Sequence, residues 1–405
     1  PEVRSGAGGG GAIMKEAIIK EETGHLFTSG HTACAGCGQS LGVRLVMRAA
    51  GRNIIVANAT GCLEIFSSNY PLSAWEVPWV HSLFENAAAV ASGVEAALKS
   101  MGKLDQIRVI SQGGDGGTAD IGLQAISGMF MRGHDILYVC YDNEAYMNTG
   151  VQRSGLTPYD AITTTTPSGK VSWGTTSSKK NMPLIAVAHG IPYVATTSVG
   201  YPFDLERKVK KALAIRGPKY LQVLVPCPLG WRHDSALCIE LAKAAVETGI
   251  YPILEWENGQ LTGARKIGKK KPVEEYLRPQ GRFRHLFESA NGKEQLARVQ
   301  AIADANIERY GLIEKQSPAA PPPPAAAKTF TLAELARYDG QEGRPAYLAY
   351  QGKVYDVTES PLWRRGLHQR EHAAGKDLTS DMSGAPHQEE VLSGFSVVGE
   401  LKESA

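Results

Sequence analysis

The sequence predicts a doubly wound α/β fold, followed beyond a proline-rich spacer by a small α+β domain. Apolar, β-branched runs of strand length alternate with longer helical runs through the large N-terminal part of the chain. Such alternation is typical of a parallel sheet whose two faces are covered by helices. The stretch QSPAAPPPPAAAK then interrupts the pattern, because proline lacks the N–H that a sheet ladder needs and favours extended polyproline geometry.

Four strand-length runs and two longer runs support this prediction. The strand runs are apolar without polar alternation, which indicates strands buried on both faces. The longer runs have the length and apolar period of helices. The expected strands are 54–58, 107–111, 136–141 and 220–225, and the expected helices are 87–98 and 121–131.

Composition sets the domain plan and limits the classes of partner. Of the 405 residues, 43% are hydrophobic and 21% are charged, as in globular chains of two or three domains. The net charge of +2 gives no reason to expect a nucleic-acid partner, and no apolar stretch is long enough to cross a bilayer. We expect a glycine-rich linker at 1–13, with Met14 as a natural start, then domains at 14–315 and 329–405 joined by the spacer at 316–328.

Glycines and oxygen donors follow two of the expected strands. The strand ending near residue 111 is followed by Gly113–Gly117, which contains Asp115, and the next strand is followed by Asn143. Glycine lets backbone N–H groups approach a phosphate, and carboxylate and amide oxygens suit Mg²⁺. Because ligands of open α/β sheets bind at the carboxyl ends of strands, the pair favours a diphosphate–magnesium site over a ligand-free turn.

Six cysteines are too few for a disulfide scaffold in a chain of this length, so we expect a cytoplasmic protein whose cysteines bind metal or pack in the core. The pair Cys34 and Cys37 by itself fits a redox dithiol, half a zinc site or half an iron–sulfur site. Cys62 and Cys227 each follow an expected strand and can reach one edge of the sheet. Buried packing is the better interpretation for the remaining two cysteines, Cys140 and Cys238.

In combination, CAGCG, TGC, GDG with a following Asn, and PCPLGW resemble the β subunits of 2-oxoacid:ferredoxin oxidoreductases, over residues 24–309. The resemblance implies thiamine diphosphate, with Mg²⁺ bound by Asp115, Asn143 and the carbonyl of Ala145. The usual second Asn of the motif is replaced in the run Asp142-Asn143-Glu144. By the same resemblance, Gly61, Cys62, Gly114, Gly116 and Gly117 contact the cofactor, and Cys34, Cys37, Cys62 and Cys227 hold one [4Fe–4S] cluster.

The segment Asn148-Thr149-Gly150-Val151-Gln152 resembles the NTGxQ loop of the same family. The resemblance places Asn148, Thr149 and Gln152 beside the thiazolium and the substrate, where an amide can hydrogen-bond an oxygen without titrating. A polar loop held by Asn turns is the alternative.

The resemblance also implies a reaction. A 2-oxoacid, coenzyme A and oxidised ferredoxin give acyl-CoA, CO₂ and reduced ferredoxin, with pyruvate as the first choice of substrate and branched-chain or aromatic oxoacids as alternatives. In this family an α subunit supplies the carboxylate that activates the thiamine, so we expect the chain to need α, γ and δ subunits and to be inactive alone. Two other functions stay open: a non-redox thiamine decarboxylase or synthase, and an assembly or electron-relay subunit.

The segment from Lys328 to Ala405 resembles the cytochrome b5-like haem/steroid-binding family through FTL, GKVYDVT and FSVVG. Two imidazoles can hold the iron of haem b from both sides. His387 stands where that family has its second axial ligand. The family's HPGG motif is absent, and His368 and His372, which at a spacing of four would share a helical face, are the candidates for the other ligand. A haem-free docking module is the alternative.

Overall fold

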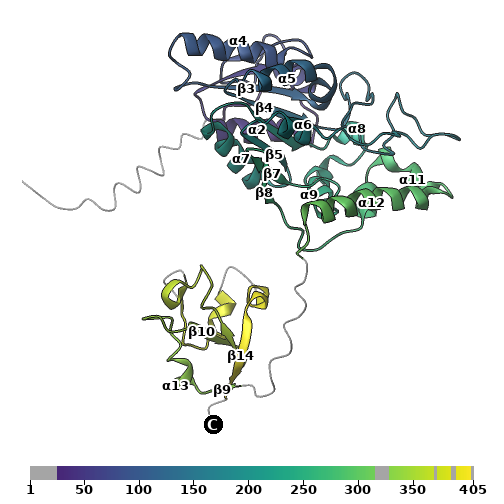
Figure 1. Ribbon diagram of the computed structural model, residues 1–405. Coiled ribbons are helices and arrows are strands. Elements are labelled where there is room, and N and C mark those ends of the chain that lie inside the picture. The colour runs from purple at the N-terminus through teal and green to yellow at the C-terminus, as the bar shows by residue number, and fades with distance from the viewer. Residues whose placement is uncertain (1–24, 315–327, 369–371, 385–388, 403–405) are drawn as a thin grey trace, which may run out of the picture. The chain divides into compact units, whose positions relative to one another are not determined.

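The computed structural model describes residues 25–314, 328–368, 372–384 and 389–402. The chain divides into two compact units, Pro1–Lys315 and Gln316–Ala405 (Figure 1). The predicted linker at 1–13, most of the spacer at 316–328, and His387 lie outside the described residues. Each unit is built around its own core.

An eight-stranded sheet forms the centre of the larger unit, with the strand order β2-β1-β3-β4-β6-β5-β7-β8. The first six strands in this order are parallel, as predicted. They are β2 (Trp79–His81), β1 (Ile54–Asn58), β3 (Arg108–Gly114), β4 (Ile136–Asp142), β6 (Lys219–Leu224) and β5 (Tyr193–Ser198). The expected strands therefore all form, and three of them end or begin one to three residues from the predicted bounds.

The sheet is mixed rather than wholly parallel, because an antiparallel hairpin extends one edge. It consists of β7 (Leu254–Glu257) and β8 (Gln260–Ala264), and β7 pairs antiparallel with β5. Asn258 and Gly259 join the two strands with φ values of +47° and +81°. An Asn-Gly turn with both residues at positive φ is the usual signal of a two-residue hairpin, so the sequence carried this information.

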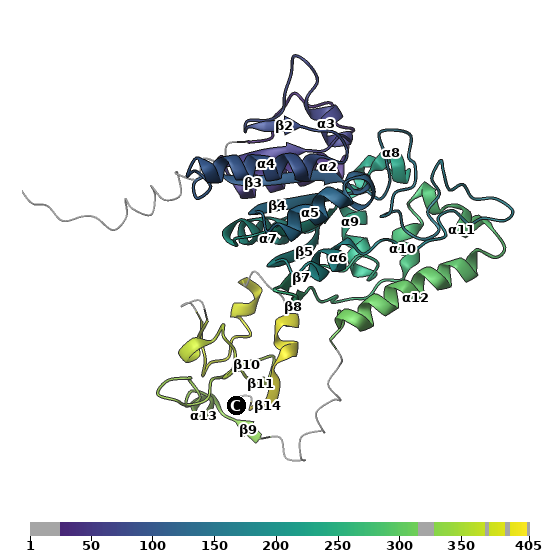
Figure 2. The same cartoon turned by 45° about the horizontal axis from the view of Figure 1, so that its top comes forward.

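Helices cover both faces of the sheet, which confirms the doubly wound prediction (Figures 1 and 2). Successive side chains of β4 point to opposite faces: Leu137 and Val139 pack in one core, and Ile136 and Tyr138 in the other. One face carries α2 (Gly38–Ala50), α3 (Cys62–Ser67) and α7 (Pro202–Ala214), and the other carries α4 (Ala87–Ser100), α5 (Leu123–Met131) and α6 (Met182–Ala188).

The expected helix at 121–131 is shorter than predicted. It begins at Leu123 and is preceded by a π-helical turn, η1 (Gly117–Ile121). The Gly122 N–H donates to the Gly117 carbonyl oxygen at 3.0 Å, and a Cβ at Gly122 would lie 2.2 Å from that oxygen. Glycine at 122 therefore permits the wider turn directly after the Gly113–Gly117 run.

A third core lies among shorter elements that follow the last parallel strand. It contains Trp231, Tyr276 and Phe283, all of them buried. The long helix α12 packs on α10 and α11 in this lobe (Figure 2). The helices are α8 (Pro228–Trp231), α9 (Cys238–Glu247), α10 (Val273–Leu277), α11 (His285–Glu288) and α12 (Gly292–Tyr310).

The smaller unit contains a four-stranded sheet in the order β10-β11-β14-β9. A capping box between Thr331 and Glu334 starts its short helix α13 (Leu332–Leu335). The strands are β9 (Lys328–Phe330), β10 (Tyr347–Tyr350), β11 (Lys353–Asp356) and β14 (Ser396–Leu401). Lys328, assigned to the spacer from the sequence, pairs with Gly399 as the first residue of β9.

His368 and His372 do not share a helical face. They lie on β12 (Leu367–His368) and β13 (His372–Ala373), which pair antiparallel with these two residues opposite each other. Their ring centroids are 6.4 Å apart. The helical interpretation was wrong because residues four positions apart can also lie opposite each other in an antiparallel pair of strands.

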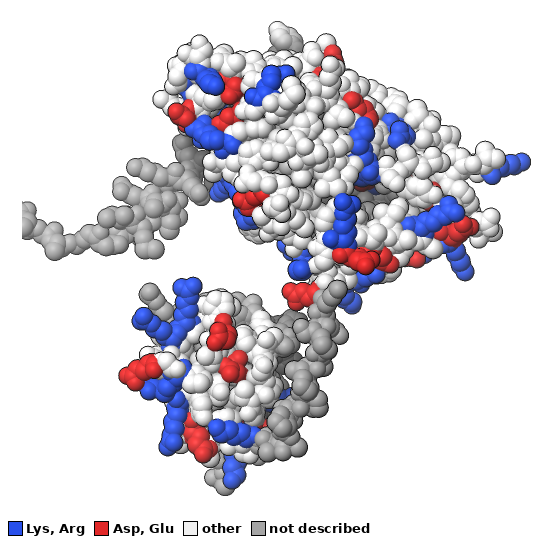
Figure 3. Space-filling model, viewed as in Figure 1, with Lys and Arg blue, Asp and Glu red and all other residues white. Residues whose placement is uncertain are grey.

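On the face seen in Figure 3, basic and acidic side chains are interspersed on both units, and neither sign forms a continuous patch. Among the described helices, none has the length and hydropathy of a membrane-spanning segment.

Candidate functional site

A pocket opens at the carboxyl ends of β1, β3 and β4, where the sequence predicted a ligand site. Gly114, the last residue of β3, pairs with Tyr141 of β4, so the segments that leave these strands lie side by side. The unfilled space of the pocket, counted out into the open solvent, is about 370 Å³. It is lined by Gln39, Thr60, Gly61, Cys62, Phe84, Gly114, Asp115, Gly116, Gly117, Asn143, Ala145, Tyr146, Met147, Asn148 and Thr149.

Three groups that could hold a cation converge in this pocket. One terminal atom of the Asn143 amide lies 2.8 Å from the Ala145 carbonyl oxygen and 2.9 Å from Asp115 Oδ1. An amide nitrogen at this position would donate to both oxygens, whereas an amide oxygen would leave three acceptors facing one another. Neighbouring oxygens of an octahedral Mg²⁺ with 2.0–2.1 Å bonds are about 2.9 Å apart. The distances from Asn143 to Ala145 and to Asp115 are therefore those of neighbouring oxygens around one divalent cation.

The buried charges around the loop 142–145, which we call the metal loop, do not balance. Asp115, Asp142 and Glu144 are at most 2% exposed. Lys179 lies 2.7 Å from both Asp142 and Glu144, and Arg282 lies 2.6 Å from Glu144. Three carboxylates thus face two cations. Burial and then the neighbouring Asp142 raise the pKa of Asp115 well above its usual value, as expected for a carboxyl group that lacks a cation.

Each oxygen of Asp115 has a separate neighbour. The Ser154 hydroxyl donates to Oδ2, and Oδ1 faces the Asn143 amide. The pocket glycines differ: a Cβ at Gly116 would lie 2.1 Å from the Tyr146 ring, which packs against this backbone, whereas a Cβ at Gly114 would meet no atom within 4 Å and so faces open space. The site therefore combines an oriented carboxylate with an open backbone.

The three residues expected beside a substrate are not all at the pocket. Asn148 and Thr149 line it, and the neighbouring Asn148 side chain lowers the pKa of the Cys62 thiol, against the larger effect of burial. Gln152 lies behind them: it accepts from the Thr149 hydroxyl at 2.5 Å and donates to the Thr149 carbonyl oxygen at 2.7 Å. Its contacts orient Thr149.

The structure brings together four cysteines from three distant segments, and one of them, Cys62, lines the pocket. Cys62 starts α3 and lines the pocket, and Cys227 precedes α8. Burial, then the neighbouring Cys227 and Cys37, raise the pKa of Cys62 to about 12. Burial, then Cys37 and Cys34, raise the pKa of Cys227 to about 11. We call Cys34, Cys37, Cys62 and Cys227 the thiol group.

Close backbone packing aligns the two loops that carry these thiols. The Gly38 N–H donates to the Pro226 carbonyl oxygen at 3.1 Å, next to Cys37 and Cys227. Gly36, at φ +71°, has no room for a Cβ, which would lie 2.4 Å from the Ser235 carbonyl oxygen. Among the described residues, no three His, Cys, Asp or Glu side chains are placed to hold a single metal ion.

The two remaining cysteines are buried. Cys140 is 0% exposed within β4, and Cys238 is 5% exposed at the start of α9. The Cys238 sulfur lies 3.9 Å from the Pro226 carbonyl oxygen, behind the thiol group.

Several residues of the site escaped sequence reasoning. Gln39 is 3% exposed, lines the pocket, and its Oε1 has no hydrogen-bond partner in the described structure. Its position two residues after Cys37 was a usable signal. Ser154, Lys179 and Arg282 had no such signal, because each comes to the metal loop from a distant segment by tertiary packing.

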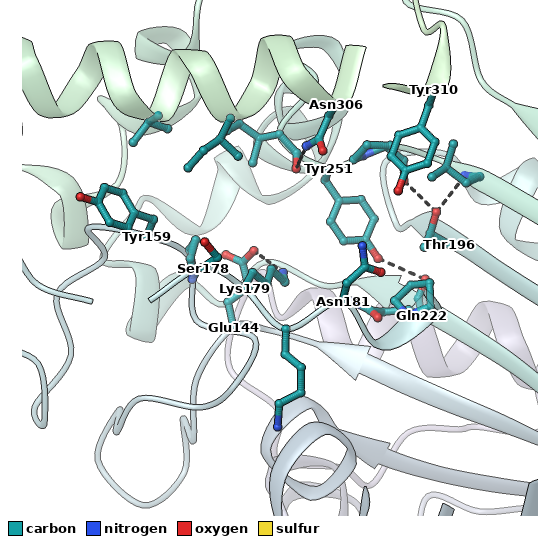
Figure 4. A pocket seen from close by; sticks show the side chains of 18 of the residues that line it. Glu144, Tyr159, Ser178, Lys179, Asn181, Thr196, Gln222, Tyr251, Asn306 and Tyr310 are labelled. Atoms are coloured by element: carbon teal, nitrogen blue, oxygen red, sulfur yellow. Dashed lines mark hydrogen bonds and ion pairs between the residues drawn. The ribbon is translucent and has the colours of Figure 1, made fainter. Parts of the chain in front are cut away.

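A second, larger cavity lies behind the metal loop (Figure 4). It contains about 1060 Å³ of open space, with Tyr251, Tyr310 and Asn306 on one side and Lys179 and Glu144 on the other. Glu144 lines this cleft, whereas Asn143 and Ala145 line the first pocket. The metal loop is therefore the wall between the two cavities.

Comparisons with protein families agree with this geometry. Residues 59–223 match the thiamine pyrophosphate enzyme, C-terminal TPP binding domain. Residues 331–402 match the cytochrome b5-like heme/steroid binding domain. The first range contains the whole pocket wall except Gln39, and the second contains His368, His372 and His387.

The chain is similar to pyruvate synthase subunit PorB of Methanosarcina barkeri, with 59% identity over 71% of this chain and 97% of that protein. It is 50% identical to ketoisovalerate oxidoreductase subunit VorB of Pyrococcus abyssi, over 64% of this chain and 86% of that protein. A solved cytochrome b5 domain protein of Methanococcoides burtonii is 56% identical over 19% of this chain and 100% of that chain, with a TM-score of 0.19. The chain belongs to the PorB family of 2-oxoacid:ferredoxin oxidoreductase subunits and carries a cytochrome b5-like domain after its catalytic part.

Proposed function

We propose that this chain is the β subunit of a pyruvate:ferredoxin oxidoreductase and holds thiamine diphosphate, Mg²⁺ and one [4Fe–4S] cluster. The complex would convert pyruvate and coenzyme A into acyl-CoA and CO₂ and pass the electrons to ferredoxin. One observation carries the proposal: a single pocket has three converging cation ligands on one wall and a cysteine of the thiol group on another.

The metal ligands would be Asp115 Oδ1, the Asn143 amide oxygen and the Ala145 carbonyl oxygen. A divalent cation there would offset the excess negative charge of the metal loop. The diphosphate would lie against the backbone of Gly114, Gly116 and Gly117, and open space at Gly114, where a Cβ would meet no atom within 4 Å, supports this. When bound, thiamine diphosphate supplies an electron sink for decarboxylation.

The position of Cys62, between the proposed thiamine site and the proposed cluster, would allow electrons to pass from one to the other. This residue lines the cofactor pocket and belongs to the thiol group, so a cluster held by Cys34, Cys37, Cys62 and Cys227 would stand beside the thiamine. Asn148 contacts Cys62 and lines the same pocket, where its amide can orient substrate without changing charge. A non-redox thiamine enzyme has no use for such a thiol group.

Pyruvate is the proposed substrate because the PorB relatives carry the higher identity, and ketoisovalerate is the alternative because of VorB. Comparison of kcat/KM for pyruvate, 2-ketoisovalerate, 2-oxoglutarate and phenylglyoxylate in the assembled complex tests this choice. A preference for any of the other three would contradict it.

The experiment for the cofactors is anaerobic purification of the full chain, followed by iron, acid-labile sulfide and thiamine analysis. We expect about four irons per chain for one [4Fe–4S] cluster, and loss of the cluster in Cys227→Ser. Cys140→Ser is the matched control, because Cys140 is buried in β4 away from the thiol group. Iron that is absent from the wild type or unchanged in Cys227→Ser would contradict the cluster.

Activity would require partner subunits. An α subunit would supply the activating carboxylate, and γ and δ subunits would complete the route to ferredoxin. We place the complex in the cytoplasm, where thiolates stay reduced. The purified chain should be inactive with pyruvate, coenzyme A and ferredoxin, and should gain activity when the partners are added; turnover by the chain alone would contradict this.

For the smaller unit we propose binding of haem b, with His387 as one axial ligand and His368 or His372 as the other. The match to the cytochrome b5-like domain supports this. The Trp363 ring centroid lies 5.1 Å from that of His368. The full chain supplied with haem should show a Soret band that His387→Ala abolishes. Parallel His368→Ala and His372→Ala variants identify the other ligand, and the lack of a Soret band in the wild type would leave a haem-free docking module.

A further inference from the structure

We infer that the short helix α8 couples the two proposed cofactor sites, with Trp231 as the positioning residue that connects the thiol group to the metal loop. Binding of thiamine diphosphate with Mg²⁺ would then change the properties of the cluster, and the state of the cluster would change cofactor affinity. This inference rests on the proposed function, because both cofactors must be present.

The two ends of α8 contact the two sites. Cys227 precedes the helix, and its sulfur accepts from the Gly230 N–H at 3.4 Å. At the other end the Trp231 indole N–H donates to the carbonyl oxygen of Asn143 at 2.7 Å. Asn143 also carries one of the three converging cation ligands. Four peptide bonds therefore separate Cys227, a proposed cluster ligand, from Trp231. The Trp231 side chain in turn holds the backbone of Asn143, a proposed metal ligand.

Trp231 has little freedom to absorb a displacement. It is fully buried, and the Arg282 guanidinium lies over its ring at 4.0 Å while the Tyr276 ring packs edge-on at 6.2 Å. Arg282 also pairs with Glu144 at 2.6 Å, so the group that fixes the indole holds the next residue of the metal loop. A rigid indole transmits movement of α8 to Asn143.

The opposite side of the metal loop is open, because the cleft of Figure 4 lies behind Glu144. There Lys179 holds Glu144 through an ion pair with an O–N distance of 2.7 Å, and Glu144 adopts a φ of +71°, which is unfavourable for a residue with a side chain. Directional contacts therefore set the position of the loop, and loss of one of them leaves it free to shift toward the cleft.

A second contact joins the same elements. A Cβ at Gly230 would lie 2.0 Å from the Met147 sulfur, and Met147 lines the cofactor pocket. An added methyl group at position 230 would displace the end of the Met147 side chain, which fills the space between α8 and the segment 145–149. It would disturb this contact without removing a hydrogen-bonding side chain.

Coupling between two sites is reciprocal, so one measurement detects it. The midpoint potential of the cluster is measured in the anaerobic full chain with and without thiamine diphosphate and Mg²⁺. We expect the affinity for thiamine diphosphate with Mg²⁺ to differ at least five-fold between the chain with an oxidised cluster and the chain with a reduced cluster. This difference appears as a shift in midpoint potential, and a ten-fold difference equals about 59 mV. Trp231→Phe keeps an aromatic ring but removes the donor, and should reduce the shift to less than two-fold. Trp256→Phe makes the same change at a buried site in β7 and should keep it.

Three outcomes separate the hypotheses. Absence of iron or of thiamine binding in the wild type contradicts the proposed function. Binding of both without a potential shift, or a full shift in Trp231→Phe, overturns the coupling. If Trp231→Phe does not fold, Gly230→Ala takes its place: a reduced shift supports coupling through α8, and an unchanged shift overturns it.

Discussion

Asp115 is a buried carboxylate whose direct neighbours in the described structure are neutral groups, the Ser154 hydroxyl and the Asn143 amide. Asp115→Asn should therefore fold and, without ligands, be at least as stable as the wild type, because it removes an uncompensated buried charge. It should lose stabilisation by thiamine diphosphate and Mg²⁺. A ligand at 100 times its Kd stabilises by about 2.7 kcal/mol, and this increment should disappear from thermal unfolding. Asp304→Asn, at an exposed site, is the control; a ligand-induced increment retained in Asp115→Asn would contradict the metal assignment.

Asp160 predicts a pH dependence of stability. It is 1% exposed, its Oδ2 has no described hydrogen-bond partner, and burial raises its pKa from 3.8 to about 6. Between these values the folded state binds more protons than the unfolded state, so the contribution of Asp160 to stability falls as pH rises from 4 to 6 and is constant above. Asp160→Asn should thus stabilise at pH 7 by up to about 3 kcal/mol, and by almost nothing near pH 4. Urea unfolding at both pH values checks this, and an equal effect at both would contradict the raised pKa.

Residues that orient a neighbouring side chain were the least predictable from the sequence. The motif positions Asp115, Asn143 and Cys62 could be placed at one pocket from the sequence, because each follows a strand that ends at the same edge of the sheet. The partners that orient them come from segments whose proximity depends on packing. Gln152 illustrates this, because a motif places it near the substrate while the actual turn directs it to Thr149.

The turn between β3 and η1 offers a prediction for an element. Gly116→Ala should destabilise the fold by about 1–3 kcal/mol, because its methyl group would overlap the Tyr146 ring. Gly114→Ala is the matched variant: its methyl group meets no atom within 4 Å, so stability should change little while thiamine affinity falls. Chemical unfolding and thiamine titration separate the two effects. Equal stability of the two variants would contradict the close contact at Gly116.

Elements that depend on burial were predicted well from sequence, whereas those that depend on local geometry were not. The β4 run is apolar throughout because both faces of the strand are covered, and this pattern has few alternatives. The π-turn η1 follows from a backbone contact at Gly122, which periodicity cannot reveal. The pair β12–β13 was mistaken for helix because residues four positions apart, such as His368 and His372, can be neighbours in either structure.

For the whole molecule, the separate cores predict two independent unfolding transitions. When the full chain and a chain that ends at Lys315 are compared without bound cofactors, the unfolding transition of the larger unit should occur at the same temperature in both. Scanning calorimetry of the full and shortened chains checks this, and one cooperative transition in the full chain would contradict it. The order of the two units was predictable from the proline-rich spacer, whereas the antiparallel edge of the sheet required the Asn258-Gly259 turn to be recognised.

The surplus carboxylate of the metal loop has a consequence for turnover in the cell. Under the proposed function, a subunit without a divalent ion would carry a destabilised core at the carboxyl ends of its central strands, and so would populate open forms more often. Proteases cleave such forms. Cellular levels of the protein should therefore follow the supply of thiamine and magnesium even at constant synthesis, so that unloaded copies are removed before they can occupy places in the assembly.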